Sequence, residues 1–436
     1  MSNNSKFSPS TAAAIVIANM IGTGVFTSLG FQLIDIKSGF VILLLWILGG
    51  VIAICGALCY AELGARLPRS GGEYNFLSQI YHPMAGFISG CVSATVGFAA
   101  PTALAAITFG VYLSSVFPQL SPLWLATALI VVMTLVHATS HRNSGNMQTF
   151  FTIAKIALVT GFSIAALYAV DSYQLVRFTP EAADIELITT GSFAVALIYV
   201  GYAYSGWNAA TYLTGELENP AKTLPLVLAV GTGVVMLSYM LLNTMFLLVA
   251  PIDAMEGKLE IGYVAATYAF GDIGASIMGV SLALLLVSTV SAMIIAAPRV
   301  LQVVGEDFSV FHFLGKLNKN GVPATAVYLQ GGITLLFLWT ASFESILIFS
   351  GATMALNTLC AVLGVFILRH REGDEGVESM PVFRVPFYPL PPLLFVFLTG
   401  GTLIYLTIER PVEIIFSFVV IGAGAIAYLL SKRFER

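Results

Sequence analysis

The feature that most constrains this chain is a succession of twelve long apolar runs. A helix needs about 20 predominantly apolar residues to cross the hydrocarbon core of a bilayer. Short polar or turn-rich segments separate the runs and predict spans near residues 10–34, 40–65, 84–116, 122–140, 147–170, 189–214, 224–250, 273–304, 323–341, 345–368, 387–407 and 412–431. In lipid, only a helix pairs all its backbone groups within one segment, and the runs lack the alternation of β-barrel strands. We therefore predict an all-α membrane protein of about twelve transmembrane helices.

The amino-acid composition also indicates a membrane environment. Hydrophobic residues make up 58% of the 436 residues and charged residues 10%, against about 45–50% and 25% in soluble domains. The net charge of −4 gives no reason to expect a nucleic acid partner. All four cysteines lie inside apolar runs, without the spacing of a disulfide framework or a metal site. We expect the lipid bilayer as partner and no metal, nucleic acid or cofactor.

Lysine and arginine residues predict the orientation, because cytoplasmic loops are enriched in them. Twelve spans place both termini on one side. If that side is the cytoplasm, fourteen Lys and Arg residues lie in inner segments, four lie in outer segments, and Lys155 lies within a span. We predict a multi-pass protein of the cytoplasmic membrane with both termini in the cytoplasm. Glu62, Glu216 and Glu218 lie near inner span ends, and we interpret them as partners of loop cations such as Arg66 rather than as proton carriers.

Two spans carry glycine-rich polar segments at their middle, residues 19–26 in the first and residues 201–208 in the sixth. Glycine weakens a helix, and unpaired backbone groups are tolerated at membrane depth only where they line a cavity. Close helix packing is the alternative explanation for such glycines. Five spans begin with each break, as in transporters built from two inverted repeats. We predict one transmembrane domain over residues 1–436, with repeats at about 10–170 and 189–368 and two extra helices at about 387–431.

The breaks also suggest a ligand. The N–H groups at the start of a half-helix and its dipole favour a carboxylate. The carbonyls at the end of the preceding half-helix favour an ammonium group. An α-amino acid carries both groups on adjacent atoms, so it is the predicted substrate.

The chain resembles the amino acid–polyamine–organocation (APC) superfamily of transporters, and within it the L-type amino acid transporters and their bacterial relatives. The resemblance is carried by IGTGVF at residues 21–26, YAELG at 60–64, PRSGGEY at 68–74, YSGWN at 204–208 and ELENP at 216–220. It implies two inverted five-helix repeats plus two extra helices, and transport by alternating access.

In the first break, the resemblance implies that the amides around Thr23 and Gly24 hold the substrate carboxylate. The carbonyls of Met20 and Ile21 help to hold the amino group. Gly22 belongs to the same glycine-rich binding segment.

In the sixth span, the carbonyls of Tyr202, Ala203 and Ser205 take the corresponding place beside Gly206. Tyr202 stands where related transporters carry an aromatic gate over the substrate, and packing within the helix bundle is the alternative role. The absence of an acidic residue in mid-span suggests a neutral amino acid.

Lys155 is a functional candidate because a cation at the bilayer centre costs about 2.5 kcal/mol or more. By the resemblance, it stands where sodium-coupled relatives bind an ion, between the first and eighth spans. Ser288, Thr289 and Ser291 of the eighth span are its expected partners. We therefore predict a sodium-independent exchanger or facilitator. A proton-coupled symporter that uses Lys155 is the alternative.

Other classes of protein fit the sequence less well. There is no phosphate loop, metal-binding histidine pair or nucleophile elbow that would indicate a membrane enzyme. There is no continuous polar stripe that would indicate a channel. In animal members of the resembling family, a cysteine between the third and fourth spans bridges to a heavy subunit. Residues 117–123 contain no cysteine, so no disulfide-linked heavy subunit is expected.

Overall fold

The computed structural model describes residues 9–69, 71–139, 145–217, 219–375 and 383–434. This part of the chain is helical and contains no β-strand. The helices are α1 (Pro9–Met20), α2 (Gly24–Asp35), α3 (Gly39–Arg66), α4 (Glu73–Ile80), α5 (Pro83–Val92), η1 (Ser93–Ala99), α6 (Ala100–Val116), α7 (Pro122–Thr139), α8 (Gly145–Ala169), α9 (Ala182–Ile188), α10 (Gly191–Tyr204), η2 (Trp207–Glu216), α11 (Pro220–Val249), α12 (Ile252–Met255), α13 (Ile261–Asp307), η3 (Ser309–Phe311), α14 (His312–Gly315), α15 (Ala324–Thr340), α16 (Phe343–Glu375), α17 (Leu390–Glu409) and α18 (Pro411–Phe434). The predicted all-α fold class is confirmed.

Ten helices in the described residues are long and apolar enough to cross a membrane, or eleven if the pair of α9 and α10, bent by 70°, forms one span. Each of the twelve predicted spans coincides with helical structure, but α10 and α15 are shorter than predicted, at 14 and 17 residues. The reason in α10 is local. The α-helix ends at Tyr204 because Gly206 adopts a left-handed conformation with φ of 98°. The predicted span at 189–214 therefore combines an α-helix with the 3₁₀ segment η2.

Helix α13 is longer than its predicted span. It runs for 47 residues, and Gly271 interrupts the helical geometry with φ of 70° and ψ of −170°. Only glycine adopts such angles without a steric penalty. The ten residues before Gly271 form a separate segment that the prediction of 273–304 did not include. The part after the kink is the one that lies beside Lys155.

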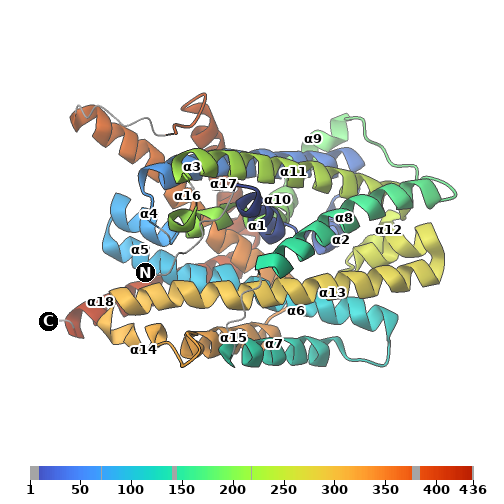
Figure 1. Ribbon diagram of the computed structural model, residues 1–436. Coiled ribbons are helices and arrows are strands. Elements are labelled where there is room, and N and C mark those ends of the chain that lie inside the picture. The colour runs from blue at the N-terminus through green and yellow to red at the C-terminus, as the bar shows by residue number, and fades with distance from the viewer. Residues whose placement is uncertain (1–8, 70, 140–144, 218, 376–382, 435–436) are drawn as a thin grey trace.

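The long helices pack around the two short half-helices α1 and α2. Helices α3 and α11 run side by side along one edge of the bundle, and α13 runs along the opposite edge with α7 and α15 near it (Figure 1). Helix α1 packs against α11, α8 and η2, whereas α10 packs against α2, α3, α16 and α17. The middle of α1–α2 and the end of α10 thereby come together inside the bundle.

Charged side chains gather at the two ends of the bundle. At one end, Lys37 bonds Glu256 at 2.6 Å, and Arg177 bonds Asp184 at 2.8 Å. At the other end, Glu62 accepts hydrogen bonds from Arg369 at 2.9 and 2.6 Å. This arrangement keeps ion pairs away from the apolar middle, where a charge is costly.

Candidate functional site

The first span is interrupted between α1 and α2. The amide of Ile21 still donates to the Ile17 carbonyl at 2.9 Å, and α2 begins at Gly24 after a non-helical segment of three residues. The first N–H groups of α2 and the last carbonyls of α1 have no partner within their own helix. The predicted break at residues 19–26 thus places inside the bundle donors and acceptors that are not paired within their own helices.

The sixth span is interrupted in the same way at the end of α10. The amide of Ser205 donates to the Tyr202 carbonyl at 3.0 Å, and Gly206 turns the chain into η2. Gly206 is needed for two reasons, its positive φ and its surroundings. A Cβ at this position would lie 2.7 Å from the Asn19 carbonyl oxygen. The two breaks therefore contact each other at Gly206.

A second glycine contact holds the breaks together. A Cβ on Gly24 would lie 2.5 Å from the Cα of Ala203. Such a distance leaves no room for a side chain, so α2 and α10 meet backbone to backbone. Ser28, one turn further along α2, donates to the Tyr199 carbonyl at 3.2 Å. The start of α2 is thus fixed against the last turns of α10.

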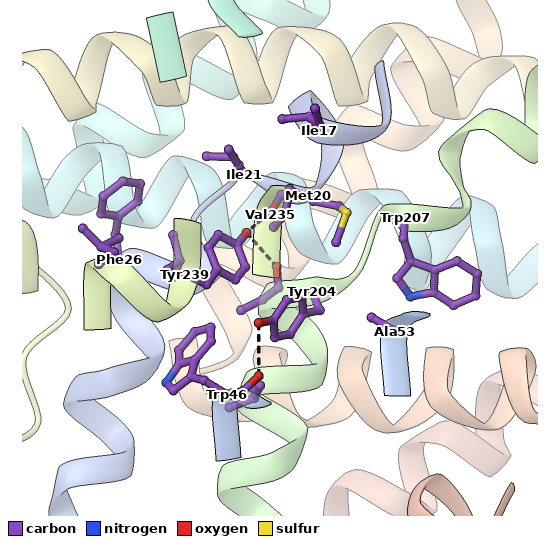
Figure 2. Close-up of a cluster of buried hydrophobic side chains, with 14 of the residues drawn as sticks. Ile17, Met20, Ile21, Phe26, Trp46, Ala53, Tyr204, Trp207, Val235 and Tyr239 are labelled. Carbon is purple, nitrogen blue, oxygen red and sulfur yellow. Dashed lines mark hydrogen bonds between the residues drawn. The ribbon is translucent and has the colours of Figure 1, made fainter. Parts of the chain in front are cut away.

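Tyr239 of α11 bonds to both breaks, and the sequence analysis did not identify it. Its hydroxyl lies 2.6 Å from the Met20 carbonyl oxygen and 3.0 Å from that of Ala203, and it can donate its single proton to either one (Figure 2). The side chain is fully buried against Trp46 and Tyr204. Two of the carbonyls predicted to hold an amino group therefore share one neutral donor. A tyrosine within an apolar span gave no signal that would have singled it out.

A cavity of about 460 Å³ begins at the two breaks. The predicted residues Met20, Gly22, Thr23 and Gly24 of the first break line it, as do Tyr202, Ala203, Ser205 and Gly206 of the sixth span. Ile21 does not line this cavity. Its side chain is buried and borders a separate cavity of about 10 Å³ beside Lys155.

Tyr202 lines the cavity beside the first break. Its hydroxyl hydrogen-bonds the Thr23 hydroxyl at 3.3 Å. Beyond it, toward the start of α10, Tyr199 donates to Glu344 at 2.8 Å, and Phe31 stacks on Phe343 with ring centroids 5.7 Å apart. Side chains of α2, α10 and α16 therefore fill the bundle on that side of the breaks.

From the breaks, the cavity extends in the opposite direction, toward Tyr74 of α4 and Arg299 and Val303 of α13. The walls between are mostly apolar and include Phe98 and Met354. Phe98 belongs to the π-helical segment η1. The wide turns of a π-helix often occur at functional sites.

Lys155 lies behind the first break, 4% exposed. Its ammonium donates to the Ala18 carbonyl at 3.3 Å and to the Thr289 hydroxyl at 2.9 Å. It thus joins α8 to α1 and α13, as expected from the sequence.

Two of the expected partners of Lys155 are placed differently. Ser291 hydrogen-bonds His137 at 2.8 Å, and in the described part of the chain Ser288 makes no hydrogen bond to Lys155. Successive residues of an α-helix are rotated by about 100°. When Thr289 faces Lys155, Ser288 and Ser291 therefore point to other sides of α13.

Acidic residues near the cavity are bound by neighbouring donors. Glu62 forms an ion pair with Arg66 at 2.7 Å, as expected, and a second with Arg369. The Glu216 side chain and Glu218 lie outside the described part of the chain. Glu73 belongs to the PRSGGEY segment but was not among the predicted site residues, and it is fully buried. It accepts hydrogen bonds from Tyr60, Asn208 and Tyr212 at 2.9, 2.6 and 2.5 Å.

Comparison with known proteins identifies the family. The family model described as "Amino acid permease" matches residues 7–429. The mouse b(0,+)-type amino acid transporter 1 is 26% identical over 95% of this chain and 85% of its own length. The human "Large neutral amino acids transporter small subunit 2" is 28% identical over 84% of this chain and 70% of its own length. The serine/threonine exchanger SteT of Bacillus subtilis (strain 168) is 27% identical over 90% of both chains.

These matches extend over almost the whole chain. They confirm the resemblance to the APC superfamily, which covers the same extent. The matched proteins are transporters and not enzymes. The long apolar helices agree with that role. The chain therefore belongs to the amino acid permease family and is a multi-pass membrane protein that transports amino acids.

Proposed function

We propose that this chain is a sodium-independent transporter of neutral L-amino acids that works by alternating access as an exchanger or facilitator. The observation that carries the proposal is the contact between the two helix breaks, whose residues line one cavity. The backbone donors and acceptors at the breaks line this cavity, where they can bind a polar ligand. An α-amino acid supplies a carboxylate for the donors and an ammonium group for the acceptors.

In this proposal, the N–H groups at the start of α2, around Thr23 and Gly24, bind the carboxylate. The dipole of α2 adds to the attraction. The carbonyls of the first break, at Met20 and Ile21, receive the ammonium group together with those of Tyr202, Ala203 and Ser205. Tyr239 donates to two of these carbonyls in the structure, so substrate binding would compete with that hydrogen bond or share it.

A neutral side chain fits the rest of the cavity best. No acidic side chain is among the described residues that line it, so none can pair with a cationic substrate. The apolar walls near Phe98, Met293 and Met354 suit an uncharged side chain. The relatives named for neutral amino acids and for serine and threonine agree with this choice.

Sodium independence rests on Lys155. Its ammonium bridges α1, α8 and α13, where a bound cation would otherwise join the same helices. A covalently attached cation needs no ion gradient. The lysine therefore supports an exchanger or facilitator over an ion-coupled symporter.

Alternating access follows from the proposed repeat architecture. We propose two inverted repeats of five helices, at about 10–170 and 189–368, with two extra helices at about 387–431. Tyr202 acts as the gate over the bound substrate, next to Thr23. The cavity leads from the breaks to the end of the bundle that carries Arg69 and Asp307. By the excess of Lys and Arg, that end is cytoplasmic, and both termini lie on that side of the cell membrane.

We further propose that transport needs no disulfide-linked heavy subunit. A relative's name describes it as a small subunit. In this chain, residues 117–121 connect α6 to α7, and residues 117–123 contain no cysteine.

The test is uptake of a labelled amino acid panel into proteoliposomes. Internal unlabelled amino acid should stimulate uptake if the protein is an exchanger, whereas a facilitator should equilibrate the label without it. Replacing sodium by choline should have no effect. Stimulation by sodium would contradict the proposal, and uptake driven by an imposed proton gradient would assign the protein to proton-coupled symporters.

A further inference from the structure

Arg299 differs in charge from the other residues that line the cavity. Of the described residues that line it, Arg299 alone has a charged side chain. The residue is exposed and lies about two turns before the end of the long helix α13. It makes no hydrogen bond or ion pair with any residue that the structure describes. A positive charge therefore faces an otherwise neutral cavity.

The two acidic side chains at the end of the same helix do not pair with this charge. Glu306 accepts a hydrogen bond from Gln302 at 2.8 Å. Asp307 lies two turns further along α13 and is bound by others. The guanidinium of Arg69 lies 3.3 Å from it, and the Tyr74 hydroxyl donates to it. The N–H donors of the Arg299 guanidinium are thus available to a ligand.

Arg299 lies at a different level of the cavity from the helix breaks. The face of α13 that lines the cavity is formed by residues at helical spacing, namely Thr289, Met293, Ala296, Val300 and Val303, with Arg299 at its edge. Thr289 bonds Lys155 at the level of the first break. Ten residues of helix separate it from Arg299, about 15 Å at 1.5 Å per residue. We name the part of the cavity bordered by Tyr74, Arg299 and Val303 the vestibule.

We propose that the Arg299 guanidinium is a second, transient binding site, which receives the substrate carboxylate in the vestibule before or after it occupies the amides of α2. The inference rests on the proposed function. A guanidinium binds a carboxylate through paired N–H donors. Apolar walls focus the field of a single charge along a cleft and raise the local concentration of the oppositely charged group. The substrate therefore enters with its carboxylate first.

The same charge makes Arg299 a specificity determinant. It repels a cationic amino acid, whose side chain brings a second positive charge into the vestibule. A neutral amino acid carries one ammonium group that can point away from Arg299 while the carboxylate points toward it. The site therefore favours neutral over cationic substrates on this face of the membrane.

The test is a charge series at residue 299 in proteoliposomes with one verified orientation of the protein. The probes are labelled L-serine, L-alanine and L-leucine, presented separately to each face. Exposed ion pairs contribute little, so we expect Arg299→Gln to raise KM on the vestibule face by about two- to fivefold. KM on the other face should not change. The KM of Arg299→Lys on the vestibule face should stay close to that of the wild type. The KM of Arg299→Glu should be higher than that of Arg299→Gln.

Two further readouts separate the charge from a structural role. KM of the wild type on the vestibule face should rise with ionic strength, whereas that of Arg299→Gln should stay constant. L-lysine should inhibit Arg299→Gln and Arg299→Glu more strongly than wild type. Arg433→Gln is the matched control, because it removes an exposed arginine from α18 outside the cavity and should change none of these values.

Equal KM values for wild type, Arg299→Gln and Arg299→Glu on the vestibule face would overturn the inference and leave the proposed function intact. Equal losses in Arg299→Lys and Arg299→Gln would also overturn it, because the charge would then not be the cause. A wild-type protein that transports none of the three probes would overturn the proposed function, and this inference with it.

Discussion

Gly24 of α2 lies so close to Ala203 of α10 that a Cβ on Gly24 would come within 2.5 Å of the Ala203 Cα. Real Cβ atoms essentially never approach another atom so closely. The contact fixes the distance between the two breaks and, with it, the distance between the donors of α2 and the carbonyls of α10. The geometry of the site therefore depends on the absence of a side chain.

Gly24→Ala should reduce both transport and stability. The methyl group would force the two helices apart, and overpacking of this kind costs about 1–3 kcal/mol. Uptake into proteoliposomes and the melting temperature in detergent measure the two effects. Gly233→Ala in α11 is the matched control, because a Cβ there would meet no atom within 4 Å and the residue does not line the cavity. Similar effects of both variants would show that space beside residue 24 is not the constraint.

Tyr239→Phe should weaken the site at the carbonyls of Met20 and Ala203. It removes their common donor, and a buried acceptor left without a partner costs about 1–3 kcal/mol. We expect a lower melting temperature without substrate and a changed KM, because the substrate ammonium group would no longer compete with the hydroxyl.

Tyr204→Phe is the control for Tyr239→Phe. The Tyr204 hydroxyl donates at 3.1 Å to the Trp46 carbonyl, away from the breaks (Figure 2). This variant should lower stability by a similar amount with KM unchanged. A change in KM of equal size in both variants would contradict a specific role of Tyr239 in the site.

Tyr202→Ala should impair transport more than folding. An aromatic lid mainly helps to close the site over bound substrate. Tyr202→Phe keeps the ring and loses only the 3.3 Å hydrogen bond to Thr23, so it should retain most of the activity. Wild-type transport by a well-folded Tyr202→Ala protein would reduce this residue to a packing role.

Lys155→Met should lower transport strongly and leave it independent of sodium. It keeps the length of the side chain but removes the donor to Ala18 and Thr289. The junction of α1, α8 and α13 would then lose its cation. Sodium-stimulated uptake by the wild type would contradict this role. Lys258→Met, at an exposed loop residue, controls for the loss of one charge.

Decarboxylated and N-acylated analogues should compete poorly with amino acid uptake. Each analogue lacks one of the two groups that the paired breaks are proposed to bind. The measurement is inhibition of labelled uptake by a matched panel that includes the parent amino acid. Inhibition as strong as that of the parent would show that the assigned site is wrong.

The sequence by itself predicted the membrane-embedded helical fold, the two breaks and the family. These features depend on local signals, because apolar length and glycine content decide within about 20 residues whether a segment spans the membrane as a regular helix. Lys155 was also evident, since a cation within an apolar run is conspicuous. The exact end of α10 was not, because a glycine permits the left-handed turn seen at Gly206 but does not require it.

The tertiary structure alone decided which side chains meet at the breaks. Tyr239 reaches Met20 across 219 residues of sequence, and Lys155 bonds Thr289 rather than Ser288 or Ser291. These contacts depend on how each helix is rotated about its axis. Helices in lipid are apolar on the outward face as well as the inward face, so hydrophobic periodicity does not reveal that rotation. Only the packing of the assembled bundle determines which residues face the site.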